Sequence, residues 1–453
     1  MRRHVAKRHA GGKPGDQLSA LPRKRIAEND IRQRSEELSI YWAHQHTLNA
    51  FIAYIKCRSN SKFEKLIIQN NQIETGTFAA TTLATGNCVL KSAAGIGKDR
   101  LERTTMGHSE ISTVPRGDQL HRMLIAELSE AGCFRPATAR SIVHATVVLG
   151  CYALAFIVLL ADPSAPVRAV AVAALAFLSV QAGFLAHEAG HGALTRNRRV
   201  ATCVGQVFNT LLTALCYSYF SHIHREHHPH CNERARDPDM QSEFFSMYRQ
   251  SAISKTGLGR IISRHQAVLI WILVWLQGFT LKIDSLRFLR CNPRTTRIDQ
   301  IMLALHFVLW FVPPVVALGI ADAALNYALV TLLIGPYLGT IFLVNHIGTR
   351  VIEPGESLSF FEQEIAVTRN LGSSPLQDLF FGGLNNHIEH HLFPSMPTAR
   401  LRNARPIVRN FCSRHGIAYQ EMSWFAAARE VTRHFREMSA FVPSRERPAH
   451  ATR

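Results

Sequence analysis

Three short clusters of histidine are the residues best suited to chemistry in this sequence. They read His-Glu-Ala-Gly-His at residues 187–191, His-Arg-Glu-His-His at 224–228 and His-Ile-Glu-His-His at 387–391. A further histidine, His346, ends an apolar stretch. The candidate metal ligands are His187, His191, His224, His227, His228, His346, His387, His390 and His391. On a random-composition estimate, two H-x-x-H-H clusters together with one H-x-x-x-H would occur in less than roughly 1% of chains.

The spacing within each cluster suits metal binding from a helix. Residues at positions i and i+4 share one helix face, so His187 and His191 can hold one metal ion between them. The pattern H-x-x-H-H adds a nitrogen at i+3 and another at i+4, so that one helical turn can serve two neighbouring ions. Eight or nine imidazoles exceed the four ligands of a tetrahedral zinc site. They suit two octahedral-type ions with open positions, and imidazole is a good ligand for iron.

The first cluster also matches H-E-x-x-H, the zinc-protease pattern in which Glu188 would be the general base. A zinc protease needs only one further ligand, so this interpretation leaves both H-x-x-H-H clusters unexplained. In the two-metal interpretation, Glu188 instead hydrogen-bonds to a ligand imidazole and orients it. Other acids that could orient an imidazole are Glu226, Glu389, Asp237 and Asp239.

Two pairs of apolar stretches must position the clusters. Residues 142–160 and 167–186 form one pair, and residues 301–320 and 323–345 form the other, each long enough to cross a bilayer. The connector within each pair is short, and Arg168 is the only basic residue in either connector. The outer ends carry Arg135, Arg140, Arg196, Arg198, Arg199, Arg290, Arg294, Arg297 and Arg350. By the positive-inside rule, both hairpins enter the membrane from the cytosol.

Two shorter apolar stretches, residues 203–220 and 266–281, contain polar residues. The histidine clusters can share one site only if an even number of crossings separates them, so neither stretch should cross the membrane. The expected fold is therefore an all-α integral membrane protein. It has four transmembrane helices in two hairpins, interfacial helices, and a cytosolic helical cap that carries the histidine site.

The first 117 residues are basic and show no sustained periodicity, so we expect a flexible extension before a membrane domain at residues 118–453. Met106 is a candidate for the true start of translation. The nine cysteines include no C-x-x-C pair, which favours reduced thiols over a disulfide or zinc framework. The formal charge of +18 favours an anionic membrane face or an acidic protein partner. A nucleic-acid-binding protein would not need four membrane spans.

From about residue 118 to residue 441 the chain resembles the membrane-bound fatty acid desaturases. The resemblance is densest from Arg-Asn-Leu-Gly at 369–372 to His-Ile-Glu-His-His-Leu-Phe-Pro-Ser-Met-Pro at 387–397. This stretch is similar to the bacterial acyl-CoA or acyl-lipid branch, akin to the front-end (linoleoyl-CoA type) enzymes. The resemblance implies that eight of the candidate histidines bind a non-haem di-iron centre. It implies the same of His346, which fits the family's additional ligand region.

The resemblance also implies a reaction and its partners. Two iron ions would use O2 to remove one hydrogen from each of two neighbouring methylenes of a long acyl chain, which leaves a cis double bond and water. The chain departs from relatives in having Glu188 where many have Asp, and His387 where many front-end enzymes have Gln. No His-Pro-Gly-Gly haem signature occurs, so electrons should come from a separate ferredoxin or cytochrome b5-like donor with its reductase.

The expected enzyme acts on an acyl-CoA or a lipid in a membrane, which is the cytoplasmic membrane if the source is bacterial, with its histidines on the cytosolic face. No nucleic acid is expected as a partner. A membrane di-iron hydroxylase or ketolase is the alternative, because it shares the first hydrogen abstraction and differs only in the later transfer of oxygen.

Overall fold

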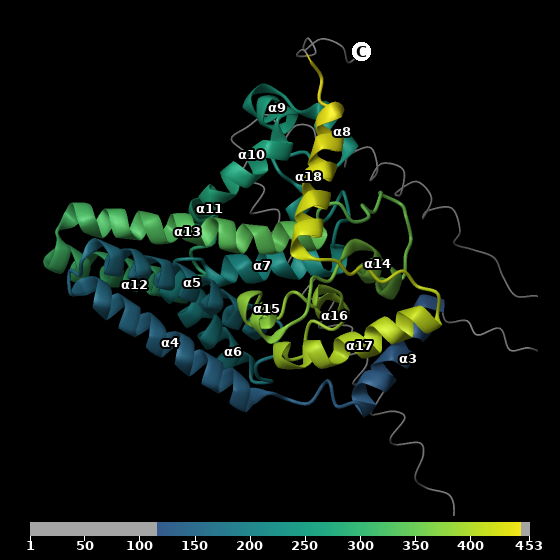
Figure 1. The fold of residues 1–453 in the computed structure, drawn as a ribbon, viewed down its shortest axis with the longest axis horizontal. Coiled ribbons are helices and arrows are strands. Elements are labelled where there is room, and N and C mark those ends of the chain that lie inside the picture. Colours follow the sequence, from purple (N-terminus) through teal and green to yellow (C-terminus); the bar gives the residue numbers. More distant parts are fainter. Residues whose placement is uncertain (1–115, 445–453) are drawn as a thin grey trace, which may run out of the picture. The chain divides into compact units, whose positions relative to one another are not determined.

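The computed structural model describes residues 116–444, and this part of the chain is helical, without a β-strand. Figure 1 shows long helices on one side and a group of shorter helices on the other. The expected N-terminal extension, with the candidate start at Met106, lies outside the described residues except for its last two positions.

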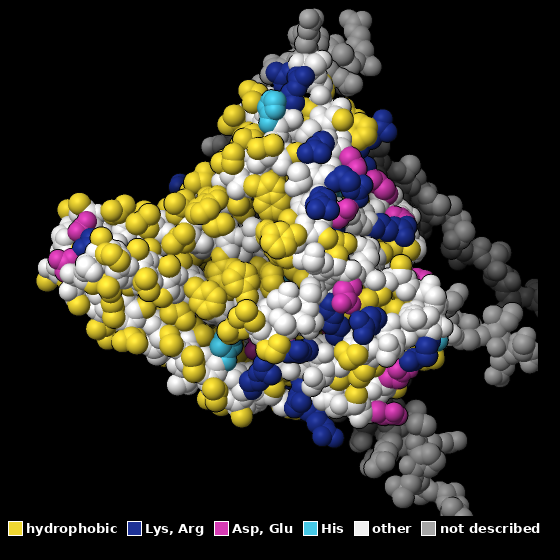
Figure 2. All heavy atoms as spheres, in the orientation of Figure 1, with side chains coloured by type: hydrophobic (Ala, Val, Ile, Leu, Met, Phe, Trp, Pro, Cys, Tyr) yellow, Lys and Arg dark blue, Asp and Glu magenta, His cyan; other side chains and the backbone are white. Residues whose placement is uncertain are grey.

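Five helices are long and apolar enough to cross a membrane. Four of them correspond to the expected hairpins. They are α4 (Thr138–Leu160), α5 (Ala165–Gly190), α12 (Arg297–Leu318) and α13 (Ile320–His346). These helices are apolar on nearly all faces, as lipid contact requires. Their outer faces carry exposed side chains such as Val143 and Val316, and Figure 2 shows this hydrophobic surface over that side of the molecule.

The fifth apolar helix spans Gln266–Cys291, in the region that the sequence predicted to lie at the interface. It is made of α10 (Gln266–Leu273), a single 3-10 turn and α11 (Gln277–Cys291). Figure 1 shows α10 and α11 meeting α13 obliquely. A Cβ atom on Gly278 would lie 2.2 Å from the carbonyl oxygen of Thr331, so the two helices touch backbone to backbone.

The other short apolar stretch, residues 203–220, does not form one long helix. It is divided among α6 (Arg198–Gly205), a π-helix (Gln206–Leu211) and α7 (Tyr217–His227). Ala214 adopts a φ of 60° between the π-helix and α7, which ends the regular helix there. The segment therefore turns back toward the histidines that α7 carries.

An ion pair joins the two hairpins at the ends that lie away from the histidines. Arg168, near the start of α5, donates a hydrogen bond of 3.0 Å to Asp322 at the start of α13. It also pairs with Asp162 in the α4–α5 turn. Figure 2 shows a few charged side chains at this end of an otherwise hydrophobic surface.

Shorter helices form a cap at the histidine end of the hairpins. Helix α3 (Arg116–Glu130) packs with α14 (Phe360–Val367), α16 (His387–Leu392) and α17 (Thr398–Arg414) around a separate apolar core. Helix α18 (Trp424–Ala440) packs on α10 and α13. The remaining short helices are α8 (Arg249–Ser254), α9 (Gly257–Arg264) and α15 (Pro375–Phe380).

Candidate metal centre

All nine histidines singled out from the sequence meet where the hairpins join the cap. They come from the C-terminal end of α5, from α7 and the turn after it, from the last residue of α13, and from α16. Seven of the nine are buried, and His191 and His224 are partly exposed. Segments that lie up to 204 residues apart in the sequence (His187 and His391) therefore build one site.

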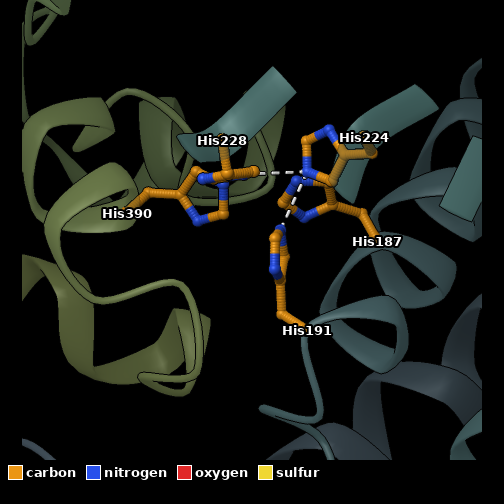
Figure 3. A group of neighbouring side chains, drawn as sticks. All are labelled: His187, His191, His224, His228 and His390. Carbon is orange, nitrogen blue, oxygen red and sulfur yellow. Dashed lines mark hydrogen bonds between the residues drawn. The ribbon is translucent and has the colours of Figure 1, made fainter. Parts of the chain in front are cut away.

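Five of these imidazoles form one group, which we call the first histidine group. Its members are His187, His191, His224, His228 and His390. One ring nitrogen from each lies within 4.8 Å of the others. Figure 3 shows the five rings facing one another, with His224 Nε2 between its two neighbours. That atom lies 2.8 Å from His191 Nε2 and 3.0 Å from His228 Nε2.

The other four imidazoles form the second histidine group: His227, His346, His387 and His391. Ring nitrogens of His227, His346 and His391 lie within 4.8 Å of one another. His387 joins them because its Nε2 lies 2.7 Å from His346 Nε2. The two groups are adjacent, with the ring centroids of His228 and His391 separated by 4.2 Å.

Helical spacing distributes each H-x-x-H-H cluster between the two groups. In the 224–228 cluster, the residues at i and i+4 belong to the first group and His227 at i+3 belongs to the second. In the 387–391 cluster the assignment is reversed, and His390 at i+3 belongs to the first group. The prediction that one helical turn serves two neighbouring positions agrees with this geometry.

Each imidazole of the second group is held at Nδ1 by an acceptor from the protein. The Nδ1 of His227 lies 3.1 Å from Asp237 Oδ1, and that of His391 lies 2.8 Å from Glu364 Oε2. The Nδ1 of His346 faces Cys231 Sγ at 3.3 Å and the Val367 carbonyl at 3.4 Å. The Nδ1 of His387 faces the Leu384 carbonyl at 3.2 Å and the side-chain amide of Asn345 at 3.3 Å. A proton on each Nδ1 leaves the Nε2 lone pair free to bind a metal ion.

The first group lacks such acceptors. Among the described residues, none of its five imidazoles hydrogen-bonds to a carboxylate or a backbone carbonyl through its ring, and the buried Nδ1 of His228 has no partner. Contacts within this group run from imidazole to imidazole. Its rings are therefore oriented by their helices and by one another.

The electrostatics of the two groups also differ. Burial lowers the pKa of His191 to about 4. Burial and the neighbouring imidazoles hold the pKa values of His224, His228 and His390 well below the ordinary value. Burial also opposes protonation of His227, but the adjacent Asp237 carboxylate outweighs it and raises the pKa of His227 well above the ordinary value.

The residues present fit metal ions. Neighbouring Nε2 atoms only 2.7–3.0 Å apart can share at most one proton, and most of these imidazoles are neutral because of burial. Within the described residues, the buried Nε2 atoms of His390 and His391 have no hydrogen-bond partner. Converging lone pairs of this kind are suited to a cation between them. Neutral imidazole is a ligand that iron accepts well, and nine of them can supply two ions.

The acids expected to orient imidazoles divide into two sets. Asp237 contacts His227, and Asp239 lies 3.4 Å from it, as the sequence predicted. The prediction for Glu188 and Glu389 is wrong: Glu188 accepts from the backbone N–H of Thr398, and Glu389 from Asn370 and Tyr419. Glu226 also contacts none of the nine histidines within the described chain. Because the Glu188 carboxylate is hydrogen-bonded to the start of α17, it is also poorly placed to be the general base of a protease.

Glu364 is the orienting residue that the sequence analysis missed. It lies in α14, fully buried, between Phe361 and Ile365 on the apolar face of that helix. An acid inside an apolar helix stripe needs a buried partner, so this pattern is a signal that could have identified it. Cys231, three residues after His228, was also overlooked because a single cysteine has no distinctive spacing.

A cavity of about 370 Å³ leads away from the histidines between α5 and α13. His187, His224, His227 and His346 line its inner end. Its walls are mainly apolar and aromatic, with Phe220, Ile223, Leu338 and Phe342 among them. The cavity therefore gives an apolar molecule direct access to both histidine groups.

Comparison with known proteins gives an independent result. The family model described as "Fatty acid desaturase" matches residues 163–423. A Delta(8)-fatty-acid desaturase of Borago officinalis is 27% identical over 343 residues, which cover 71% of this chain and 75% of that protein. An acyl-lipid (9-3)-desaturase of the same plant is 26% identical, over 57% of this chain and 60% of its own length. Fatty acid desaturase 3 of Bos taurus is 27% identical, over 57% and 59%.

Proposed function

Because the chain belongs to the fatty acid desaturase family and is thus an oxidoreductase, we propose that it introduces a cis double bond into a long-chain acyl substrate at two iron ions, with O2 as the oxidant. The observation that carries this proposal is the convergence of nine imidazoles in two adjacent groups at the end of an apolar cavity.

The histidines would hold the two ions, one in each group. His187, His191, His224, His228 and His390 would hold one ion, and His227, His346, His387 and His391 the other. Bound iron would supply the oxidising power, since a methylene has no acidic hydrogen that a side chain could remove. Asp237 and Glu364 keep the Nδ1 protons of His227 and His391 in place, so that the Nε2 atoms point inward.

The cavity between α5 and α13 would position the acyl chain. Phe220, Ile223 and Phe342 would exclude water from the acyl chain. Histidines of both groups line the same cavity, so both groups would lie beside one stretch of methylenes. The names of the Borago officinalis relatives specify double-bond positions in acyl substrates. For this chain we propose the substrate class alone, a long-chain acyl group on coenzyme A or on a lipid.

We also propose that residues 118–453 form the desaturase domain, with four membrane-crossing helices and the histidines on the cytosolic side. Helices α5 and α13 both end at the site, so they end on the same side of the bilayer. Three apolar helices separate the second and third histidine clusters, and an odd number of crossings would place those clusters on opposite sides.

The helix Gln266–Cys291 is the one most consistent with an interfacial position. Its second half carries Lys282, Asp284, Arg287 and Arg290, and it meets α13 obliquely (Figure 1). The basic surface beside the cap would then face the cytosol and receive a separate acidic electron donor, a ferredoxin or a cytochrome b5-like protein.

The test is the acyl composition of cells that express the chain. With O2 present, we expect acyl products lighter than the substrate by two hydrogen atoms, and we expect none without O2. A product heavier by one oxygen atom would instead support a hydroxylase or ketolase. Product formation without O2, or an unchanged acyl profile in the presence of a working electron donor, would contradict the proposal.

A further inference from the structure

A second cavity, of about 750 Å³, lies on a different side of α5 from the acyl cavity. It is enclosed by the first part of α4, by α5, by the α15 region and by the start of α17. Among the described residues, Phe184 alone lines both cavities. The second cavity is thus a separate space, and neither histidine group lines it.

The rim of this cavity beside the starts of α4 and α17 is basic. Arg140 and Arg400 both line it, and both also line a smaller adjoining cavity of about 320 Å³, so the two side chains face a common space. In the described chain, neither has a carboxylate within 4 Å. A third arginine, Arg402, pairs with Asp378 at 3.4 Å, and Glu188 is bonded to the backbone of Thr398.

Two long helices begin at the same rim. Helix α4 starts at Thr138 and α17 at Thr398, and neither has a side-chain cap from its own N-cap residue. At the start of α4, unpaired backbone N–H groups and the helix dipole favour an anion. At the start of α17, the Glu188 carboxylate already accepts from the Thr398 N–H. The cavity also contains a buried polar atom that lacks a hydrogen-bond partner in the described chain, the Nε of Arg400.

The wall of the cavity farther along α4, away from this rim, is apolar and open to the outer surface of the helices. Val143 and Val147 on α4 are 61% and 54% exposed, and Leu185 lies opposite on α5. Figure 2 shows Lys and Arg side chains where the hydrophobic surface of the long helices ends. A cavity with a cationic rim at this level and an apolar wall below it matches the two parts of a membrane lipid.

We propose that this cavity binds an anionic phospholipid, with its phosphate between Arg140 and Arg400 and one acyl chain along Val143, Val147 and Leu185. The lipid is distinct from the substrate, because α5 separates the two cavities. Glu188 and Thr398 line the lipid cavity, and Glu188 follows His187 in α5 while Thr398 begins the helix after the third histidine cluster. The bound lipid therefore steadies the contact between the segments that carry the first and third clusters.

The experiment is native mass spectrometry of the full chain in non-ionic detergent, titrated with phosphatidylglycerol or phosphatidylcholine. We expect one phosphatidylglycerol per chain, bound about tenfold more tightly than phosphatidylcholine. Arg140→Ala and Arg400→Ala should each weaken phosphatidylglycerol binding about tenfold. Arg409→Ala, on an exposed part of α17 outside the cavity, is the matched control and should bind as the wild type does.

Ala399→Glu guards against loss of binding through misfolding. It places an acid in the first turn of α17, where it favours the helix, but directly in the proposed phosphate position. We expect lipid binding to be lost without a fall in Tm. Equal lipid binding by wild type, Arg140→Ala, Arg400→Ala and Ala399→Glu would overturn the proposal, as would equal affinity for the two lipids.

Two competitors separate the proposed ligand from other phosphate compounds. Neither acyl-CoA nor inorganic phosphate should displace phosphatidylglycerol at an equal concentration. Displacement by acyl-CoA would show that the cavity holds the head of the substrate, and displacement by phosphate would show a simple anion site; either result overturns the lipid site. Because binding requires neither iron nor turnover, its failure is distinguishable from a failure of the proposed desaturase activity.

Discussion

The two histidine groups are built from the same clusters but are supported differently. In the second group each imidazole has a protein acceptor at Nδ1, provided by Asp237, Glu364, the Val367 and Leu384 carbonyls and the Cys231 thiol. In the first group, within residues 116–444, imidazoles contact mainly one another. The tautomers of the second group are thus set before a metal binds, and those of the first group are set by the metal itself.

Neighbouring sites on the same helices can therefore differ in preorganisation. Fixed tautomers and ring orientations raise metal affinity, because the imidazoles then lose less conformational freedom when the metal binds. We therefore expect the second group to hold its metal ion more tightly than the first. Four measurements would test this expected difference in metal affinity.

The largest effects are expected from His390→Ala and His391→Ala, adjacent substitutions that affect different groups. Each should abolish desaturation and lower the iron content from about two ions per chain to about one. The iron that remains in His390→Ala should be in the second group and thus resist a chelator, whereas the iron in His391→Ala should be removed readily. Metal analysis and Mössbauer spectra with graded chelator would check this. Two irons and full turnover in either variant would contradict the assignment.

Glu364→Gln should have the next largest effect. It removes the carboxylate charge beside His391 Nδ1 but keeps the size of the side chain. We expect iron affinity of the second group to fall about 10- to 100-fold, with the first group unchanged. Glu362→Gln is the matched control, because Glu362 is in the same helix and caps it, which Gln can also do. A similar loss in both variants would indicate a general effect on α14.

The pH dependence of metal binding should also distinguish the groups. Without metal, His227 is protonated at neutral pH because Asp237 raises its pKa, whereas burial keeps His191, His224, His228 and His390 neutral. Metal binding to the second group must therefore release a proton. Its affinity should rise up to about tenfold per pH unit until pH exceeds the pKa of His227, and the affinity of the first group should stay nearly constant.

Competition titrations with Co²⁺ at several pH values, in His390→Ala and His391→Ala, would measure one group at a time. Asp237→Asn should remove most of the pH dependence, because it removes the charge that keeps His227 protonated. Equal slopes for the two groups would show that their protonation states do not differ.

The smallest effect is expected from Cys231→Ser. The thiol lies 3.3 Å from His346 Nδ1, but the Val367 carbonyl is a second acceptor at 3.4 Å and remains in the variant. Iron affinity of the second group should change by less than about threefold. Cys203→Ser, at an exposed position, serves as the reference. A tenfold loss would mean that sulfur, not the carbonyl, orients His346.

The sequence identified the histidines because their arrangement depends on local geometry. A helix places i, i+3 and i+4 on one side regardless of the rest of the fold, so spacing alone indicated that His227 and His228 could serve different positions. All nine predicted residues meet in the structure. Their role as iron ligands stays a prediction until metal is measured.

The partners of the imidazoles could not be predicted in the same way. The structure brings Glu364 to His391, 27 residues away, and Thr398 to Glu188, 210 residues away. Acids next to the histidines in sequence, such as Glu188 and Glu389, point along other directions of their helices. Which acid reaches an imidazole is decided by tertiary packing, on which local spacing carries no information.

Prediction of the membrane-crossing helices from hydropathy was limited in a similar way. The four helices of the two hairpins were predicted from apolar length, but Gln266–Cys291 passes the same criterion in the structure. Hydropathy measures how well a segment tolerates lipid and not its angle to the membrane. The angle of α10 and α11 depends on contacts such as that of Gly278 with Thr331, which are not visible in hydropathy.

In the proposed topology, in which both hairpins cross the membrane, Arg168 would also affect membrane insertion during synthesis. It pairs with Asp162, six residues earlier in the same hairpin, so the first connector would cross the membrane without net charge. Its second pair, with Asp322, joins the two hairpins and would form only after the second connector had crossed as well. The Arg168–Asp322 pair would then be a marker of completed assembly.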